Sequence, residues 1–411
     1  MRIELPENVK NIQNSLFDAG YDVYAVGGCI RDTVLGRTPE DWDITTSALP
    51  DEIKSVFRHT VDTGIEHGTV TVLIYGAKGD PPETYEVTTY RIDGEYADSR
   101  HPLHVTFTDS LREDLKRRDF TINAMAYNER IGLVDLFCGQ EDLKKKLIRC
   151  VGIPDERFDE DALRILRAVR FAAQLGFNIE HDTREAVIRH AKHLDAVSKE
   201  RILTEITKLI CSSHIEVVNE LFDLGLITHI ADGFEDIKPL PESVKLPAVT
   251  SAEKAVRFAY LMRGMAAEKA AAILKNLKAD NNTVRRASLL SENVMVPLPY
   301  DRYELKKVIS KMTVKDFTDL LSMKKALSKT EEYRKCCPSE EIDSCIALFN
   351  DIMYKEEPIY MKDLVVTGNS LRSSGVPEGP SIGKILNEML DDIRRNPDNN
   401  SVLYLFSKYL R

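Results

Sequence analysis

The sequence predicts an α+β protein in which a small mixed-sheet head is followed by an all-helical neck, body and tail. Runs rich in β-branched and aromatic residues, "YDVYAVGG", "HGTVTVLIY" and "TYEVTTY", alternate with helical segments up to about residue 150. Beyond that point strand signals disappear and apolar residues recur at helical spacing. A chain of 411 residues is also too long for one ordinary core, so we expect several structural units.

The head is predicted from six successive segments. A helix over residues 12–20 ends in glycine and leads into the strand of "YDVYAVGG". A second helix covers "SALPDEIKSVF", which has Pro50 near its start, and two β-rich runs follow it. The segment "LVDLFCGQEDLKKKLIRCVG" then predicts a turn, a charged helix and a last short strand. The head therefore closes near residue 150.

The rest of the chain is predicted to be helical. The segment "DEDALRILRAVRFAAQLGF" places Leu163, Leu166, Val169 and Ala173 at helical spacing and ends at Gly176. Further helices follow with short turns, and the last 50 residues begin with a glycine-containing loop. We predict four parts: a head at 1–150, a neck at 151–210, a body at 211–335 and a tail at 336–411.

Charge and cysteine usage restrict the class of protein. The net charge is −10, yet residues 251–335 hold 18 Lys and Arg against 10 Asp and Glu, a local balance of +8. This asymmetry suggests a phosphate-rich partner, although solvated helix faces explain it equally well. The seven cysteines show no metal-ligand spacing, which predicts free thiols in a reducing cytoplasm. No apolar run approaches the ~18 residues of a membrane helix, so we expect no membrane association.

Glycines and carboxylates come together in "AVGGCIRDTVLGRTPEDWDI". Gly27 and Gly28 follow a strand and precede a helix, where backbone N–H groups can hold a phosphate. Asp41 and Asp43 would share one face of a strand and repel each other unless a cation lies between them. Glu86 in "TYEVTTY" supplies a third carboxylate. Because such a site suits Mg²⁺, we predict Asp41 and Asp43 as metal ligands and all three carboxylates as catalytic; the alternative is capping or surface charge.

Several motifs together resemble one enzyme family. The arrangement "VGG…DWDI" with a later "YEV" strand resembles the nucleotidyltransferase superfamily of DNA polymerase beta. The segments "GIEHGTVTV", "RRDFTINAMAYN" and "DEDALRILRAVRF" are similar to class II tRNA nucleotidyltransferases (CCA-adding enzymes) and bacterial poly(A) polymerases. These motifs cover residues ~20–180, and "GVPEGPSIGKIL" is similar to the family's tail.

The resemblance implies a fold and a reaction. The head would be polymerase-beta-like, and the enzyme would add C, C and A to tRNA 3′ ends from CTP and ATP without a nucleic-acid template. It would use Mg²⁺ in a two-metal transfer that releases pyrophosphate. The neck would select the nucleotide, and the basic body and the tail would bind the acceptor end of tRNA. A homodimer is possible.

The motif "LKRRDFTINAMAY" predicts contacts with the nucleotide. Arg117 and Arg118 bring positive charge beside the carboxylates, which suits a triphosphate. By the resemblance, Asp119 contacts the ribose hydroxyls and Asn123 the sugar–phosphate region. The full predicted nucleotide-binding set is Gly27, Gly28, Arg31, Arg118, Asp119, Asn123, Asp161, Arg164, Arg167 and Arg170.

Asp161 and Arg164 are predicted to choose the base. Cytosine and adenine each present an amino donor beside a ring-nitrogen acceptor, whereas guanine and uracil present a carbonyl and a ring N–H. A carboxylate with a guanidinium therefore favours C and A. The two residues would lie at i and i+3 on one helix face, and the family uses this pair as its template, with Glu160 beside it and Arg167 near the triphosphate. The alternative is a simple i,i+3 salt bridge.

Other functions remain open at this stage. The polar segment "YRIDGEYADSRHPLHVTF" predicts a mobile loop, and by the resemblance its full length favours complete CCA addition over a CC-only enzyme. Poly(A) polymerases tend to carry a basic stretch where this chain has "RHTVDTGIEHGTV", which counts against that alternative. A partial enzyme adding only CC or only A is a third possibility. A catalytically silent RNA-binding protein is disfavoured because it needs no carboxylate cluster.

Overall fold

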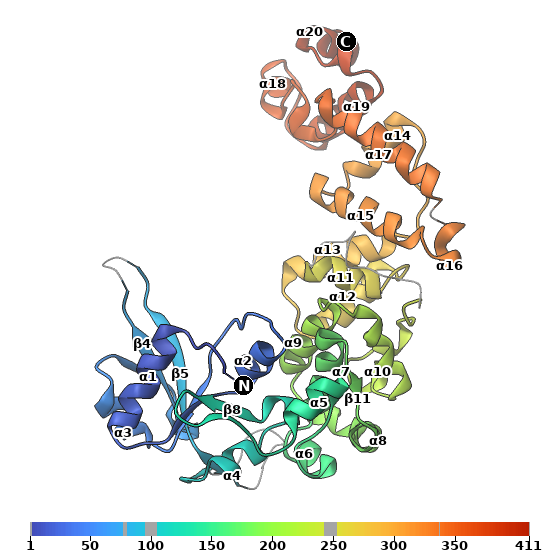
Figure 1. The fold of residues 1–411 in the computed structure, drawn as a ribbon. Helices are drawn as coiled ribbons and strands as arrows, with labels where there is room; N and C mark the ends of the chain where they lie inside the picture. Colours follow the sequence, from blue (N-terminus) through green and yellow to red (C-terminus); the bar gives the residue numbers. More distant parts are fainter. Residues whose placement is uncertain (1, 77–79, 95–104, 242–252, 337, 411) are drawn as a thin grey trace. The chain divides into compact units, whose positions relative to one another are not determined.

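The computed structural model describes residues 2–76, 80–94, 105–241, 253–336 and 338–410 (Figure 1). The chain divides into two compact units, Met1–Glu235 and Asp236–Arg411. The first unit contains the predicted head and neck and the beginning of the predicted body. The finer division into four functional parts stays a prediction.

A seven-stranded mixed sheet forms the centre of the head. Its strand order is β3-β4-β5-β2-β1-β8-β9, in which β2 and β5 are parallel and the other neighbours are antiparallel. All four residues of β1 are buried, as expected for an interior strand. The strands are β1 (Val23–Val26), β2 (Ile44–Thr46), β3 (Thr60–Gly64), β4 (Thr69–Ile74), β5 (Glu83–Thr89), β8 (Met125–Asn128) and β9 (Gly132–Asp135).

In the described part of the head, five helices accompany this sheet. Helix α1 contacts β1 and α3, and its buried Val9, Ile12 and Leu16 recur at helical spacing. Helix α2 contacts β1 and β8, which places its first residue beside the end of β1. The helices are α1 (Glu7–Asp18), α2 (Gly28–Val34), α3 (Pro50–Val56), α4 (Leu111–Lys116) and α5 (Gly139–Lys145). The predicted mixed-sheet head is therefore confirmed.

The two ends of the segment predicted as a mobile loop form a pair of strands. Strands β6 (Arg91–Asp93) and β7 (Val105–Phe107) pair in antiparallel fashion. Arg91 bonds Asp93 through its Nε at 2.9 Å. The central residues 95–104 lie outside the described residues, so the loop prediction stays a prediction.

Helices make up most of the rest of the first unit. They are α6 (Pro154–Glu160), α7 (Leu163–Leu175), α8 (His181–His190), α9 (Lys199–Ile210) and α10 (Glu220–Asp223). Helix α7 is the most buried of them and contacts α9 and α6. Short 3₁₀ turns connect elements of both units: η1 (Ile65–His67), η2 (Thr121–Asn123), η3 (Ala191–Ala196), η4 (Ile215–Asn219), η5 (Ile227–His229), η6 (Phe234–Asp236), η7 (Met361–Asp363) and η8 (Pro397–Asn399).

One strand pair corrects the prediction that strands end near residue 150. Strand β10 (Leu147–Ile148) pairs in parallel with β11 (Asn178–Ile179), which lies beyond α7. The backbone N–H of Asn178 donates to the carbonyl of Lys146, and that of Glu180 to Ile148, both at 2.9 Å. A strand of two residues shows no alternation of polar and apolar residues, so the sequence carried no signal for it. This pairing attaches the neck to the head.

The second unit is built from helices. They are α11 (Lys254–Leu261), α12 (Ala267–Asn276), α13 (Asn281–Asn293), α14 (Arg302–Ile309), α15 (Val314–Leu327), α16 (Glu331–Arg334), α17 (Ser339–Tyr354), α18 (Gly368–Ser373), α19 (Pro380–Arg395) and α20 (Val402–Tyr409). Helix α13 contacts α11, α12 and α15, and the C-terminal helices share a core around Leu371, Met389 and Leu405. The predicted helical architecture is confirmed. Within the described ranges, no helix is long and apolar enough to cross a membrane.

The positive charge of residues 251–335 is partly internal. Arg286, which is buried, bonds Asp316 at 2.6 Å and Asp319 at 2.5 Å. Lys306 and Lys324 are also buried: Lys306 pairs with Glu357 and donates to the carbonyl of Arg394, and Lys324 donates to the carbonyl of Val294. Because these charges stabilise the helical fold, the local balance of +8 overstates the charge available to a phosphate-rich partner.

Candidate active site

A cavity of about 730 Å³ lies within the first unit, walled by the start of α2, the segment before β2, η2, and the helices α7 and α9. Most of the predicted site residues line it. They are Gly27, Gly28, Arg31, Asp41, Asp43, Arg118, Asp119, Asn123, Arg167 and Arg170. Three predicted residues, Glu86, Asp161 and Arg164, are not part of this lining.

Gly27 makes the turn between β1 and α2. Its φ of 85° and ψ of −133° lie in a region that residues with a side chain rarely adopt. A Cβ at this position would lie 3.1 Å from Arg118 Nη1 and 3.9 Å from Asp43 Oδ2. Its N–H donates to the carbonyl of Met125 at 3.2 Å and is therefore not free as predicted, while contact of Gly27 with the nucleotide stays a prediction. Gly27 instead permits Arg118 and Asp43 to approach, while Gly28 begins the helix, where N–H groups lack helical partners.

Asp41 and Asp43 lie immediately before β2, not within a strand as predicted, because β2 begins at Ile44. The carbonyl of Asp43 nevertheless accepts a hydrogen bond from Val26 N at 3.0 Å, which extends the pairing with β1. On the other side, Ile44 pairs with Val87 in parallel register. The preceding residues of the two strands, Asp43 and Glu86, therefore lie level on the same face of the sheet.

Electrostatics connect the three carboxylates. Burial raises the pKa of Asp43, Arg118 opposes this increase, and the charge of Asp41 adds to it. Burial also raises the pKa of Glu86, and the charges of Asp43 and Asp41 raise it further. Three carboxylates thus repel one another on one face of the sheet. Such a donor set gains most from a bound cation.

Asp119 is the centre of a buried hydrogen-bond network. Arg167 donates to its Oδ2 from Nε at 2.8 Å and from Nη2 at 2.5 Å. Asn123 Nδ2 donates to its Oδ1 at 3.1 Å, and Arg31 Nη1 donates to Asn123 Oδ1 at 2.8 Å. Burial acts to raise the pKa of Asp119, but Arg167 and Asn123 outweigh it and hold that pKa well below its usual range. The network fixes a carboxylate at the wall of the cavity.

We expect Asp119→Asn to lower the free energy of unfolding at pH 7 by about 2–4 kcal/mol, because it leaves Arg167 without its charged partner. Since the folded-state pKa of Asp119 is depressed, its stabilising effect is complete above the ordinary carboxyl pKa of about 4 and is lost as the pH falls below that value. Urea unfolding of the two proteins at several pH values measures this. A difference that stayed constant from pH 7 to pH 3 would contradict the assignment.

The ring of Phe171 contacts three arginine side chains on the α7 side of the cavity. The guanidinium carbon of Arg170 lies 3.9 Å from the ring centroid, and those of Arg31 and Arg167 lie at 5.1 and 5.4 Å. Arg170 also forms a buried ion pair with Glu205 at 2.9 Å. Burial lowers the pKa of Arg170 to about 10, against the opposing charge of Glu205. Arg170 therefore lines the cavity and, through its contacts with Phe171 and Glu205, also holds α7 and α9 together at this wall.

Asp161 and Arg164 do not lie on one helix as predicted. Asp161 has an extended backbone (φ −144°, ψ 101°) at the C-terminal end of α6, and α7 begins at Leu163. The helix breaks because Asp161 Oδ1 accepts a hydrogen bond from Leu163 N at 3.0 Å, a local bond that aspartate forms readily at helix ends. Asp161 also pairs with Arg201 at 2.8 Å. Asp161 and Arg164 therefore do not share a helix face, and the prediction that they do is wrong.

Arg164 is buried and satisfied by other groups. It pairs with Glu160 at 2.6 Å and donates to the backbone carbonyls of Arg117 at 2.8 Å and Arg157 at 3.2 Å. The alternative of an i,i+3 salt bridge does not describe this arrangement either, because Asp161 and Arg164 bond different partners. A role of the pair in base selection stays a prediction.

Family models match two segments of the chain. Residues 23–149 match the poly A polymerase head domain, and residues 176–237 match a probable RNA and SrmB-binding site of polymerase A. The first match covers all seven strands of the central sheet, and the second begins just before α8 and runs through α10.

Relatives extend the likeness over nearly the whole chain. A CCA-adding enzyme of Leuconostoc mesenteroides is 36% identical over 94% of this chain and 92% of its own length. One of Levilactobacillus brevis is 37% identical over 95% and 94%. The chain belongs to the CCA-adding enzyme family.

Solved structures agree with this family membership. The Bacillus stearothermophilus CCA-adding enzyme in complex with CTP has a TM-score of 0.78 at 30% identity, covering 97% of this chain and 95% of that chain. The Thermotoga maritima CCA-adding enzyme complexed with tRNA_CCA shares the fold, with a TM-score of 0.67 at 18% identity, covering 100% and 99%. The chain is therefore a template-independent nucleotidyltransferase.

Membership in this family implies a divalent metal ion, and the carboxylates fit one. Burial raises the pKa values of Asp43 and Glu86, and the repulsion between carboxylates that adds to this increase is one that a dication removes. Oxygen donors of this kind suit hard cations. The donor set is therefore compatible with the metal that the family uses.

Sequence reasoning missed part of the cavity wall. The missed lining residues are Cys29, Asp32, Arg37, Thr38, Glu40, Phe171, Gln174, Leu175, Lys208, Cys211, Ser212 and Ser213. Phe171 occupies a position typical of a helix core, so no local signal distinguished it. Lys208 in α9 and residues 211–213 just after it belong to the site because α9 packs against α7, which the sequence does not reveal.

Proposed function

We propose that the chain completes tRNA 3′ ends by adding C, C and A from CTP and ATP. The single observation that carries this proposal is the cavity in which Asp41 and Asp43 face an arginine-rich wall. Negative groups for a metal and positive groups for a triphosphate are what nucleotidyl transfer needs in one place. The full-length relatives named CCA-adding enzyme favour this product over poly(A).

The predicted site residues have distinct roles in this proposal. Asp41 and Asp43 would hold Mg²⁺, and Glu86 would complete the carboxylate cluster. When bound, Mg²⁺ offsets the charge of the carboxylates and of the phosphates. Arg118 and Arg167 orient the triphosphate so that the terminal 3′-hydroxyl of the tRNA attacks the α-phosphate in line and pyrophosphate leaves.

Asp119 would bind the ribose in this scheme. Its Oδ2 already accepts a hydrogen bond from Arg167. Its Oδ1 accepts hydrogen bonds from Asn123 and, at 2.8 Å, from the N–H of Phe120. This arrangement holds the carboxylate as an acceptor for ribose hydroxyls. Arg31, through Asn123, would fix the sugar side of the cavity.

Asp161 and Arg164 would select the base at the junction of α6 and α7. In the structure each is held by a charged partner, Arg201 and Glu160 respectively. Selection requires Arg164 to exchange backbone carbonyls for the ring nitrogen of the base. Both its present acceptors and the base nitrogen are hydrogen-bond acceptors, so the exchange conserves hydrogen-bond types.

The second unit would bind the tRNA by its phosphates and shape. Exposed basic residues that remain available there include Lys275, Lys278, Lys311 and Lys329. Backbone contacts of this kind suit an A-form acceptor end. We place the reaction in the cytoplasm. The six described cysteines, which exclude Cys337, are free thiols, and free thiols are typical of a reducing compartment.

Product length on a tRNA transcript that lacks its 3′ CCA tests the proposal. With Mg²⁺, CTP and ATP, we expect one product extended by three nucleotides, and with CTP alone a product extended by two. A long ladder with ATP would instead identify a poly(A) polymerase. A limit of two or one nucleotides would identify a partial enzyme. No extension would leave an RNA-binding protein without transferase activity.

A further inference from the structure

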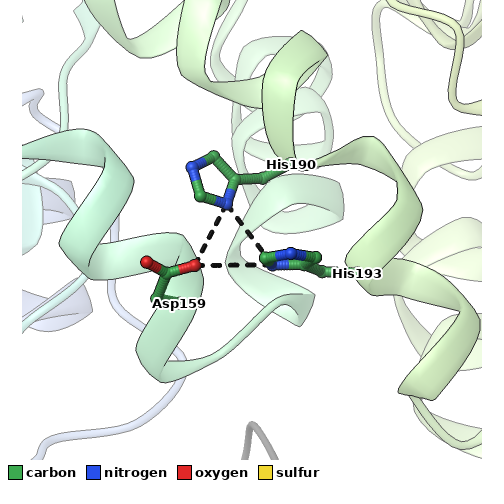
Figure 2. A group of neighbouring side chains, drawn as sticks. All are labelled: Asp159, His190 and His193. Atoms are coloured by element: carbon green, nitrogen blue, oxygen red, sulfur yellow. Dashed lines mark hydrogen bonds and ion pairs between the residues drawn. The ribbon is translucent and has the colours of Figure 1, made fainter.

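Asp159, His190 and His193 converge at the surface of the neck, away from the cavity lining described above (Figure 2). Asp159 belongs to α6, His190 is the last residue of α8 and His193 lies in η3. His190 Nδ1 is 3.2 Å from Asp159 Oδ1, and His193 Nδ1 is 3.5 Å from the same oxygen. The two Nδ1 atoms are 3.3 Å apart. The three atoms His190 Nδ1, His193 Nδ1 and Asp159 Oδ1 therefore lie close to one another.

Hydrogen bonding alone does not account for the cluster when both rings are neutral. His190 Nε2 lies 2.8 Å from Asp155 Oδ1, a carboxylate oxygen that can only accept, so Nε2 carries the hydrogen of this ring. A neutral His190 then presents a lone pair at Nδ1. One hydrogen on His193 Nδ1 can satisfy only one neighbour, which leaves the His190 lone pair facing Asp159 Oδ1. A positive charge between the three atoms would remove this repulsion.

The spacing of the three atoms matches a tetrahedral metal site. Zn–N and Zn–O bonds of 2.0–2.2 Å at tetrahedral angles place neighbouring ligand atoms about 3.3–3.6 Å apart. The three measured separations are 3.2, 3.3 and 3.5 Å. The chemistry also agrees, since imidazole nitrogens with a carboxylate select zinc-like cations over Mg²⁺.

The surroundings of the cluster resemble those of a metal centre. Asp155 accepts from the far nitrogen of His190, which fixes the ring orientation as carboxylates do for metal-binding histidines. Asp155 is itself held by Arg189 at 2.8 Å. The Asp159 and His193 side chains are 60% and 47% exposed, so a cation can enter from solvent and water can fill a fourth position.

We propose that Asp159, His190 and His193 form a binding site for one Zn²⁺ ion, separate from the proposed magnesium site. The ion would connect the C-terminal turn of α6 to the end of α8. That turn also contains Glu160, which bonds both Arg157 and Arg164. Zinc would therefore stabilise the segment that leads to the proposed base-selecting residues. The zinc site itself does not depend on the proposed function.

Zinc binding to the full chain, measured by competition with a chromophoric chelator in the presence of excess Mg²⁺, tests the proposal. We expect one Zn²⁺ per chain and a zinc-dependent rise in melting temperature. His193→Ala, at a half-exposed position, should weaken binding at least about tenfold and abolish that rise. Asp155→Asn, which removes the negative charge that His190 and Arg189 share, should weaken binding about 10–100-fold.

Two control variants locate the ion. His229→Ala removes a histidine that pairs with a single carboxylate, Asp195, at 2.9 Å, and should leave binding unchanged. Asp43→Ala should also leave it unchanged, because the active-site carboxylates do not contribute. The proposal is overturned if no zinc binds, which would indicate a cluster held by a second proton on His190, or if His193→Ala binds zinc as the unsubstituted protein does. Loss of zinc in Asp43→Ala alone would place the ion at the catalytic carboxylates and overturn it as well.

Discussion

Replacement of Asp43 by alanine should abolish transfer of both CTP and ATP to tRNA, with a fall in kcat of about a thousandfold or more. Asp43 is the central carboxylate of the proposed metal site, since it lies beside Arg118 and Gly27 and interacts electrostatically with both Asp41 and Glu86. Loss of metal-dependent charge stabilisation of ~4 kcal/mol corresponds to about a thousandfold in rate. Single-turnover extension of a tRNA ending in CC with ATP measures the effect.

Binding and stability measurements separate a chemical defect from a folding defect. The affinity of Asp43→Ala for tRNA should change by less than about threefold, because the proposed RNA-binding residues lie in the second unit. Asp18→Ala, which removes an exposed carboxylate of the same head, should keep full activity. Activity of Asp43→Ala within tenfold of the unsubstituted enzyme would refute the assignment of Asp43 as a metal ligand.

Asp43→Asn adds a readout that does not depend on turnover. Because the folded-state pKa of Asp43 is raised, its ionised form lowers stability above pH about 4, and removal of the charge should not destabilise the metal-free protein. Mg²⁺ should raise the melting temperature of the unsubstituted enzyme and have little effect on Asp43→Asn. Equal stabilisation of both proteins by Mg²⁺ would place the cation elsewhere.

Much of the fold could be predicted because its signals are local. Strand β1, helix α3 with Pro50 in its first turn, and strands β4 and β5 follow from β-branched runs and helix-start residues. The two-residue strand β11 and the break between α6 and α7 could not be predicted this way. The first is too short to show a period, and the second depends on a side-chain bond from Asp161 to the backbone.

The sequence indicated the glycine and carboxylate side of the candidate site more directly than the opposite wall. Gly27, Asp41 and Asp43 lie within one short segment, so their spacing alone revealed them. The opposite wall depends on the packing of α7 against α9 and on partners distant in sequence, such as Glu205 for Arg170. The pair His190 and His193 is three residues apart, yet its carboxylate Asp159 comes from another helix. Long-range partners of this kind become visible only in the structure.

Replacement of Arg164 by alanine should weaken base selection more than it weakens catalysis. A hydrogen bond from a charged donor contributes about 1.5–3 kcal/mol, so the preference for CTP over UTP should fall about 10–100-fold in kcat/KM. Asp161→Ala should cause a loss of similar size, because in the proposed scheme the carboxylate would accept a hydrogen bond from the amino group that distinguishes cytosine from uracil. Competition between CTP and UTP at the first added position measures both.

Structural loss can be told apart from loss of selection in this experiment. Glu160 keeps Arg157 as a partner when Arg164 is removed, so the substitution does not leave a carboxylate unpaired. Arg184→Ala breaks an ion pair of the same unit, with Glu220, and should lower stability without changing the ratio of CTP to UTP. If Arg164→Ala left both rate and selectivity unchanged, the pair would serve the α6–α7 junction alone. A fall in rate with an unchanged CTP-to-UTP ratio would assign Arg164 to positioning, because only a group that contacts the base can change the choice between two bases.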